Sequence, residues 1–328
     1  LMFLAVLFFY DRATYADTGA KSWFRFGTFS FQPSEVVKIF YILILAKVAT
    51  SHNMKTKYKT NHTDWQLFVK LILWAAPALV LVILQNDLGT TLVFLMILGG
   101  VLIMSGISWK ILLPIIIVVG LIGALLIYLV VYNRQILLNI GFKNYQFARI
   151  DSWLDPYGDQ GGNGYQLFQS LKAIGSGRML GKGFGVSDVY VPVRESDLIF
   201  ATIGENFGFL GGTFLIAIYF ILIYQMIRVC FDTKNEFYTY IATGVIMMIL
   251  FHVVENIGMT IGLLPLTGIP LPFISQGGSS LLGNMMGIGL IMSMRYHFKS
   301  TIFEDEDSAF GANHQDATML RLRQEDGK

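Results

Sequence analysis

The sequence predicts an all-helical, polytopic membrane protein with one large extracellular loop, and three observations support this fold class. Hydrophobic residues make up 54% of the 328 residues and charged residues only 14%, whereas soluble domains carry about 25% charged residues. The mean hydropathy is +0.57. Apolar stretches long enough to cross a bilayer recur along the chain. The net charge of +2, with no basic run between aromatic residues, gives no indication of nucleic-acid binding.

We expect eight membrane segments. The first, Leu1–Tyr10, gives only ~15 Å of helix against a bilayer core of about 30 Å, so we expect a partial helix and a chain that is a fragment of a longer protein. The other predicted spans are 34–50, 66–84, 88–106, 109–132, 198–229, 238–262 and 278–298. Pro33 suits the first turn of its helix, where a missing N–H costs nothing. The 198–229 stretch exceeds the ~20 residues of a span, so it is tilted or begins at a protein-lined mouth.

Lysines in the short connections predict the orientation. Lys55, Lys57 and Lys59 lie in the connector 51–65, which is therefore expected in the cytoplasm. Counting alternate sides places 11–32, 85–87, the loop 133–197 and 263–277 outside. We expect one transmembrane domain over residues 1–303 and a polar, disordered cytoplasmic tail over 304–328. The single cysteine, Cys230, excludes a disulfide within the chain.

Two acids, Asp197 and Glu205, interrupt the apolar stretch that begins near residue 198. Removing a carboxylate from water costs several kcal/mol unless a partner or a function compensates. On one helix, Asp197 would lie about 12 Å nearer the exterior than Glu205. We expect Asp197 at a half-desolvated mouth, where a raised pKa suits a general base, although helix capping also explains an Asp there. Glu205 is expected to be structural and paired with Arg or Lys.

Further polar residues gather on the predicted external side. Glu35 and Lys38 share one helix face and can pair, and Lys38 lies one turn inside the membrane, which favours a function. Trp23 is either an interfacial anchor or part of a site. Asp87, in the hairpin QNDLGTT (85–91), is a plausible N-cap, and capping alone explains it well.

Three other sequence patterns each allow a functional and a structural interpretation. His252, Glu255 and Asn256 form a polar stripe in the order H-x-x-E-N, which is not a zinc-protease motif, so we expect hydrogen bonds between helices. The segment LPLTGIPLPFISQGGSS (264–280) is too rich in Pro and Gly for regular helix at membrane depth; 277–280 offers either an anion site or simple capping. The segment AIGSGRMLGKGFG (173–185) lacks the preceding strand of a P-loop, so a fold-back is the expected role.

Four signatures in order carry a family resemblance: GAKSWFRFGTFSFQPSE, QNDLGTT, ESDLIFATIGENFGFLGG and GLLPLTGIPLPFISQGGSS. They resemble the SEDS family of shape, elongation, division and sporulation proteins, which includes RodA, FtsW and SpoVE, and the last is most like RodA. The match runs from about Gly19 to His297. Gln276 and Asn86 depart from the family pattern, where Tyr and Pro are usual, and this bears on subtype and substrate fit.

The resemblance implies a bundle of ten helices, of which this chain would hold about eight. It also implies a peptidoglycan glycosyltransferase that polymerises lipid II at the external membrane face beside a class B penicillin-binding protein, in a bacterial plasma membrane. A divalent cation, Mg or Mn, is implied, and no organic cofactor. The implied catalytic acid is Asp197. The expected substrate-binding residues, from resemblance and local chemistry together, are Trp23, Arg25, Glu35, Lys38, Asp87, Arg194, Ser279 and Ser280.

Two other functions remain open. A lipid II flippase needs polar sites near the bilayer midplane and usually repeated halves, whereas the polar groups here concentrate on one side. A scaffold that only docks a synthase would tolerate replacement of Asp197.

Overall fold

The computed structural model describes residues 4, 7, 22–26, 29–56, 58–140, 144–158, 164–233 and 235–297. Its elements are β1 (Phe24–Phe26), β2 (Phe29–Phe31), α3 (Pro33–Lys55), α4 (Asn61–Leu84), α5 (Leu88–Met104), α6 (Trp109–Tyr132), α7 (Arg134–Ile140), α8 (Asn144–Leu154), α9 (Tyr165–Gly177), α10 (Ile199–Asp232), α11 (Glu236–Thr260) and a last helix over residues 278–297. The fold is helical apart from one small hairpin, as predicted.

The seven full-length predicted spans all correspond to helices. Within the described residues, α4, α6, α10 and α11 are long and apolar enough to cross a membrane, and α5 is a shorter apolar helix. The chain is therefore a multi-pass membrane protein. Of the predicted first segment only Leu4 and Leu7 are described, and both are helical and buried. The predicted tail 304–328 lies outside the described residues.

Local sequence explains where the helices begin. Pro33 occupies the first turn of α3, where it needs no N–H partner. Thr60 and Thr63 form a reciprocal capping box at α4, and Asp87 caps α5 by accepting from the Thr90 N–H. Ser108 and Asn235 cap α6 and α11 in the same way. The boundaries therefore follow from the satisfaction of N–H groups at the start of each helix.

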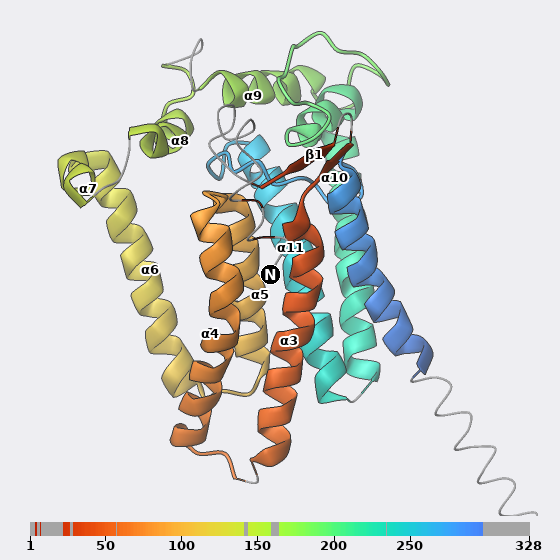
Figure 1. The fold of residues 1–328 in the computed structure, drawn as a ribbon. Helices are drawn as coiled ribbons and strands as arrows, with labels where there is room; N and C mark the ends of the chain where they lie inside the picture. The colour runs from red at the N-terminus through yellow and green to blue at the C-terminus, as the bar shows by residue number, and fades with distance from the viewer. Residues whose placement is uncertain are drawn as a thin grey trace, which may run out of the picture.

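The membrane helices run side by side, and the loop helices α8 and α9 lie across one end of them (Figure 1). Helix α11 packs against α3, α5 and α10. Its buried residues join one apolar core that includes Ile42, Phe94 and Val245. Helix α6 stands at the edge and buries only Leu112 and Val130. Because α3, α5, α10 and α11 all begin or end near the loop, this end of the bundle collects their terminal polar residues.

Two features were not predicted. Strands β1 and β2 pair in antiparallel fashion, with Phe24 opposite Phe31, and the loop 133–197 contains α7, α8 and α9 as well as turns. Residues 159–163, within the predicted run of turns, lie outside the described part of the chain. The loop thus contributes ordered helices to the same end of the bundle.

Helix α10 is broken at Gly208, whose backbone is non-helical (φ 64°, ψ −159°). The glycine-rich segment 173–185, which was predicted to fold back, packs against this break. The N–H groups of Lys182 and Gly183 donate to the carbonyls of Glu205 and Asn206, at 3.0 Å each. The Phe209 N–H donates in turn to the Arg178 carbonyl at 2.8 Å. The backbone groups freed by the break are satisfied by this segment, as burial requires.

Candidate active site

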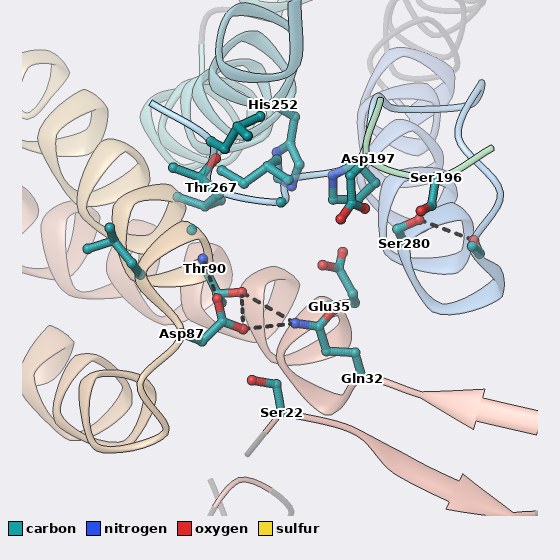
Figure 2. Close-up of a pocket in the computed structure, with 18 of the residues that line it drawn as sticks. Ser22, Gln32, Glu35, Asp87, Thr90, Ser196, Asp197, His252, Thr267 and Ser280 are labelled. Carbon is teal, nitrogen blue, oxygen red and sulfur yellow. Dashed lines mark hydrogen bonds between the residues drawn. The ribbon is translucent and has the colours of Figure 1, made fainter. Parts of the chain in front are cut away.

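A cavity of about 710 Å³ lies at the end of the bundle beneath the loop helices. Its walls come from segments far apart in sequence: the start of α3, the α4–α5 hairpin, the turn before α10, α11 and the segment 264–277 (Figure 2). Six of the nine predicted site residues line it, namely Trp23, Glu35, Lys38, Asp87, Asp197 and Ser280. Most of the site predicted from sequence is thus brought together in one place.

Asp197 lies in the turn immediately before α10, with its carboxylate at the cavity wall. It does not cap the helix, because Leu198 is the N-cap residue and makes no side-chain cap. Burial raises the pKa of Asp197 to about 6, against a smaller opposing effect of a hydrogen bond with Ser196. Within the described residues no Lys or Arg forms an ion pair with it. An acid that titrates close to neutrality beside a cavity can act as a general base.

Asn256, which is fully buried in α11, fixes the backbone around Asp197. Its amide donates to the carbonyl of Asp197 at 2.7 Å and to that of Ile269 at 2.8 Å. At Gly268 (φ +78°) an added Cβ would lie 3.3 Å from the Asp197 carboxylate, so the chain passes close by in a conformation that favours glycine. Within the predicted α11 stripe, Asn256 thus bonds to two non-helical segments rather than to another helix, and it holds the carboxylate segment in position.

Glu35 and Lys38 form the predicted ion pair on α3. The Lys38 Nζ lies 2.9 Å and 2.8 Å from the two Glu35 oxygens, and both side chains are almost fully buried. The Lys38 ammonium also contacts His252 Nε2 of α11 at 3.1 Å. A lysine buried in this way needs partners for its charge, and these two residues supply them at the cavity wall.

The hairpin between α4 and α5 brings Asp87 to the cavity. Asp87 accepts from the N–H and hydroxyl of Thr90, at 3.0 Å and 2.9 Å, and from the Gln32 amide at 3.2 Å (Figure 2). The capping interpretation of Asp87 is confirmed. Because Gln32 precedes α3, the same carboxylate also ties the hairpin to the start of that helix.

The remaining predicted residues differ in their surroundings. The Ser280 hydroxyl donates to the Gly277 carbonyl at 3.1 Å, so it does not accept an N–H as a helix cap would. Ser279 is buried but is not part of the cavity wall. The backbone of Arg25 lies in β1, and its side chain lies outside the described residues.

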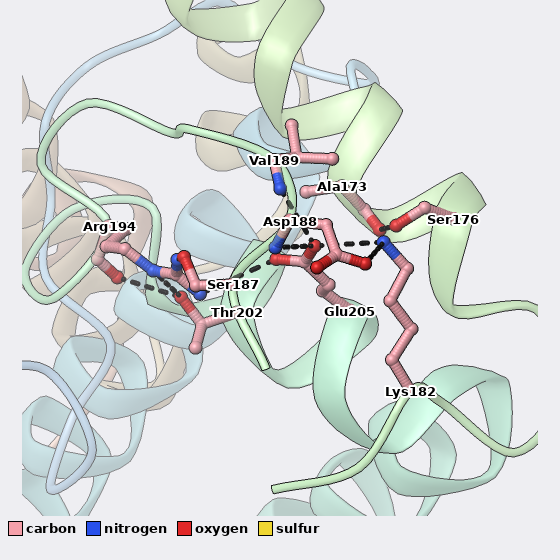
Figure 3. Close-up of polar contacts among 9 residues, drawn as sticks. All are labelled: Ala173, Ser176, Lys182, Ser187, Asp188, Val189, Arg194, Thr202 and Glu205. Carbon is pink, nitrogen blue, oxygen red and sulfur yellow. Dashed lines mark hydrogen bonds and ion pairs between the residues drawn. The ribbon is translucent and has the colours of Figure 1, made fainter. Parts of the chain in front are cut away.

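Arg194, expected to bind substrate, lies instead beside Glu205 (Figure 3). The Glu205 carboxylate is completely buried, and it pairs with Lys182 at 3.2 Å and with Arg194 at 3.5 Å. It also accepts the N–H groups of Asp188 and Val189, at 3.2 Å and 3.1 Å. The predicted structural pairing of Glu205 is thus confirmed. Its two cations hold the 182–194 segment against α10.

The cavity also includes residues that sequence reasoning did not select. Arg149, Ser152 and Gln166 come from α8 and α9 and line it from the loop side. No local pattern marks them, because their role depends on how the loop folds over the bundle. His252 also lines the cavity, beyond its predicted hydrogen bonding. Gln276 and Asn86, the two departures from the family signatures, both lie on the wall.

Comparison with known proteins now identifies the family. A model of the cell cycle proteins FtsW, RodA and SpoVE matches residues 1–300. The chain belongs to the SEDS family. It is 36% identical over 287 residues to the peptidoglycan glycosyltransferase MrdB of Escherichia coli, covering 86% of this chain and 72% of that protein.

Two solved structures are similar to this SEDS fold. One is described as showing structural coordination of polymerization and crosslinking by a peptidoglycan synthase complex. It has a TM-score of 0.71, 25% identity, and coverage of 90% of this chain and 79% of that one. The other is the rod shape determining protein RodA of Thermus thermophilus, with a TM-score of 0.58 and 26% identity over 89% of this chain and 75% of that one.

Proposed function

We propose that this SEDS protein is a peptidoglycan glycosyltransferase that polymerises lipid II into glycan strands at the external membrane face. The observation that carries the proposal is the convergence of Asp197, Glu35 and Lys38 on one cavity of about 710 Å³ at a single end of the bundle. The cavity provides an ionisable acid and a buried cation where a lipid-linked sugar phosphate can enter from the bilayer. Its similarity to MrdB supports the same activity.

In the proposed reaction Asp197 is the general base. The 4-hydroxyl oxygen of the acceptor sugar attacks C1 of the donor sugar, and its proton passes to the Asp197 carboxylate. The new O–C1 bond forms as the bond from C1 to the pyrophosphate oxygen breaks, so the configuration at C1 inverts. Undecaprenyl pyrophosphate leaves with the electron pair, and it needs no proton from an acid. General-base catalysis of this kind contributes about 10²–10⁴-fold in rate.

Positive charge at the cavity stabilises the leaving pyrophosphate. Lys38 is held at the wall by Glu35 and His252, and Arg149 of α8 lines the cavity from the loop side. Arg194 is engaged with Glu205, so its part in the proposal is to order the segment that leads to Asp197. Trp23 and Ser280, also on the wall, are suited to contacts with the sugar headgroup.

A divalent cation belongs to the same proposal. No cluster of three or more His, Cys, Asp or Glu side chains that could hold a metal occurs among the described residues. Magnesium is nevertheless commonly bound by one or two carboxylates together with substrate phosphates, and Glu35 and Asp87 are carboxylates on the cavity wall, besides the proposed base, that would fit this mode. The cation would neutralise charge on the pyrophosphate.

Two further roles follow at the level of assembly and cell. We propose a class B penicillin-binding protein as partner, in line with the resemblance to a synthase complex that polymerises and crosslinks. We also propose that the protein acts in the bacterial plasma membrane during elongation and shape maintenance, as the RodA-like signature 264–273 indicates.

The proposed function is tested by incubating the purified protein with lipid II in detergent micelles and measuring the glycan strands that form. Glycan strands should form with the wild type, and Asp197→Ala should form almost none while eluting and melting like the wild type. If the protein instead moves lipid II headgroups across vesicle membranes without polymerising them, it is a flippase. If Asp197→Ala supports unchanged synthesis by a partner enzyme, it is a scaffold. Either result would overturn the proposal.

A further inference from the structure

A second cavity, of about 680 Å³, lies between α3 and α4 in the half of the bundle away from Asp197. Its wall is made by the C-terminal half of α3 and the N-terminal half of α4. Lys47 is eight residues before the end of α3, about 12 Å along the helix. The cavity therefore reaches the depth of a bilayer interface rather than lying in the connecting loop.

Two helical stripes face each other across this cavity. Lys47, Ser51 and Lys55 follow one another at i, i+4 and i+8 on α3, and Gln66, Lys70 and Trp74 do the same on α4. Residues at this spacing share one face of a helix. Since α3 and α4 pack together, three ammonium groups and two neutral polar groups converge on one concave surface.

The lysines of this cavity have no acidic partner in the described part of the chain. None of Lys47, Lys55 and Lys70 forms an ion pair there, and no Asp or Glu lines the wall. The nearby Asp64 carboxylate is buried and accepts the Ser108 N–H at 2.9 Å. All three lysines are exposed, and three cations on one concave surface without a counter-charge from the described chain attract an anion from outside it.

Lys70 is held in place by a buried histidine. The His52 Nε2 lies 3.1 Å from the Thr63 carbonyl, which can only accept, so Nε2 carries the hydrogen. Nδ1 is then an acceptor and receives the Lys70 ammonium at 3.1 Å. Free lysines that reach for the interface take varied directions, whereas this one is fixed toward the cavity.

We propose that this cavity binds the phosphate-bearing headgroup of an anionic lipid. Lys47, Lys55 and Lys70 would contact the phosphate oxygens, with Ser51 and Gln66 as neutral donors. Trp74 is 60% exposed and Ile44 40% exposed at the rim, which gives the acyl chains an apolar surface. Basic pockets between transmembrane helices bind anionic headgroups in this way. The site is separate from the proposed active site and is independent of the proposed function.

Thermal denaturation of the purified protein in non-ionic detergent tests the proposal, with dioctanoyl phosphatidylglycerol as the titrated probe. The melting temperature of the wild type should rise to a plateau as the lipid concentration increases. In the double variant Lys47→Gln/Lys70→Gln, the apparent affinity for the lipid should be weaker by about tenfold or more. Lys59→Gln with Lys110→Gln removes the same charge outside the cavity and should bind like the wild type. Lys70→Arg should keep binding.

Further titrations distinguish a lipid phosphate from a soluble phosphate. Dioctanoyl phosphatidylcholine should give no saturable shift. Inorganic phosphate that competes with the lipid at equal affinity would overturn a lipid site in favour of a soluble phosphate. Wild-type affinity in the Lys47/Lys70 variant, or equal loss in the Lys59/Lys110 variant, would also overturn the proposal. Without lipid, both double variants should melt like the wild type, which shows that they are folded.

Discussion

His252 determines how the Lys38 ammonium is presented to the cavity. Its Nδ1 lies 2.6 Å from the Met248 carbonyl of the same helix, and a carbonyl can only accept, so Nδ1 carries the hydrogen. Nε2 is therefore the acceptor for Lys38. Glu35 holds the ammonium from the same helix and His252 from α11, so the cation is fixed by two elements rather than one.

Replacing His252 should therefore lower the reaction rate through Lys38. A hydrogen bond to a charged group contributes about 1.5–3 kcal/mol, so we expect His252→Phe to reduce kcat/KM for lipid II by roughly tenfold or more. His252→Gln keeps an acceptor on the side chain and should recover most of the loss. Equal activity of the Phe and Gln variants would show that His252 only fills space.

Residue-level prediction from sequence succeeded where a single side chain is anomalous in its local context. Asp197, Glu35 and Lys38 could be selected because ionisable groups in apolar segments need an explanation. The Arg194–Glu205 ion pair carries no local signal, since the two residues meet only after the chain folds back. Arg149 carries no local signal at all, because the loop alone brings it to the cavity.

Among the structural elements, the glycine-rich segment 173–185 and the broken part of α10 pack with their backbones in direct contact. At Gly177 an added Cβ would lie 1.9 Å from the Gly204 carbonyl oxygen, and at Gly181 it would lie 2.1 Å from that of Asn206. Only glycines allow this approach of backbone to backbone. The contact holds the glycine-rich segment against α10. The chain then continues to Arg194, which pairs with Glu205, and on to Asp197.

Gly181 and Gly185 provide a matched test of this docking. Both have φ of +79°, but an added Cβ at Gly185 meets nothing within 4 Å. Backbone strain from alanine should therefore be similar at the two positions, and Gly181→Ala should carry an additional steric cost of about 1–3 kcal/mol. Chemical denaturation of the purified variants measures the difference. Equal stabilities would mean that the close approach is absent in solution.

The apolar pattern was sufficient to predict the membrane helices, because a bilayer demands long hydrophobic stretches with internally satisfied backbone. The hairpin of β1 and β2 and the break at Gly208 were not predicted. The break depends on contacts with a distant segment, because its backbone groups are satisfied by residues 178–183, and no pattern near Gly208 predicts these contacts.

At the scale of the whole molecule, the two ends of the bundle differ in chemistry. Asp197, Glu35 and Asp87 line the cavity at one end of the bundle, and Lys47, Lys55 and Lys70 line the cavity toward the other. The loop helices α8 and α9 lie across the first of these ends (Figure 1). The described residues of the predicted external connections 85–87, 133–197 and 263–277 meet at the same end of the bundle, as expected. Which end faces the cytoplasm remains a prediction from the positions of Lys and Arg.

Cysteine labelling determines this orientation. Cys230 is the only cysteine, so Cys230→Ala gives a clean background. Tyr190, 72% exposed in the loop, and Tyr58, 83% exposed between α3 and α4, lie toward opposite ends. In intact cells, Tyr190→Cys should react with a membrane-impermeant maleimide, and Tyr58→Cys only after permeabilisation. The reverse pattern would put the cavity on the cytoplasmic side and contradict external polymerisation.

The most direct test of the central claim is the pH dependence of lipid II polymerisation by the purified protein. A base must be ionised to accept the sugar proton, and burial raises the pKa of Asp197 to about 6. The rate should therefore fall as pH drops through about 6 and level off above it. Asp197→Asn, equal in shape but unable to ionise, should lose about 10²-fold or more in rate and this inflection. An Asp197→Asn variant with the wild-type rate and pH profile would contradict the account.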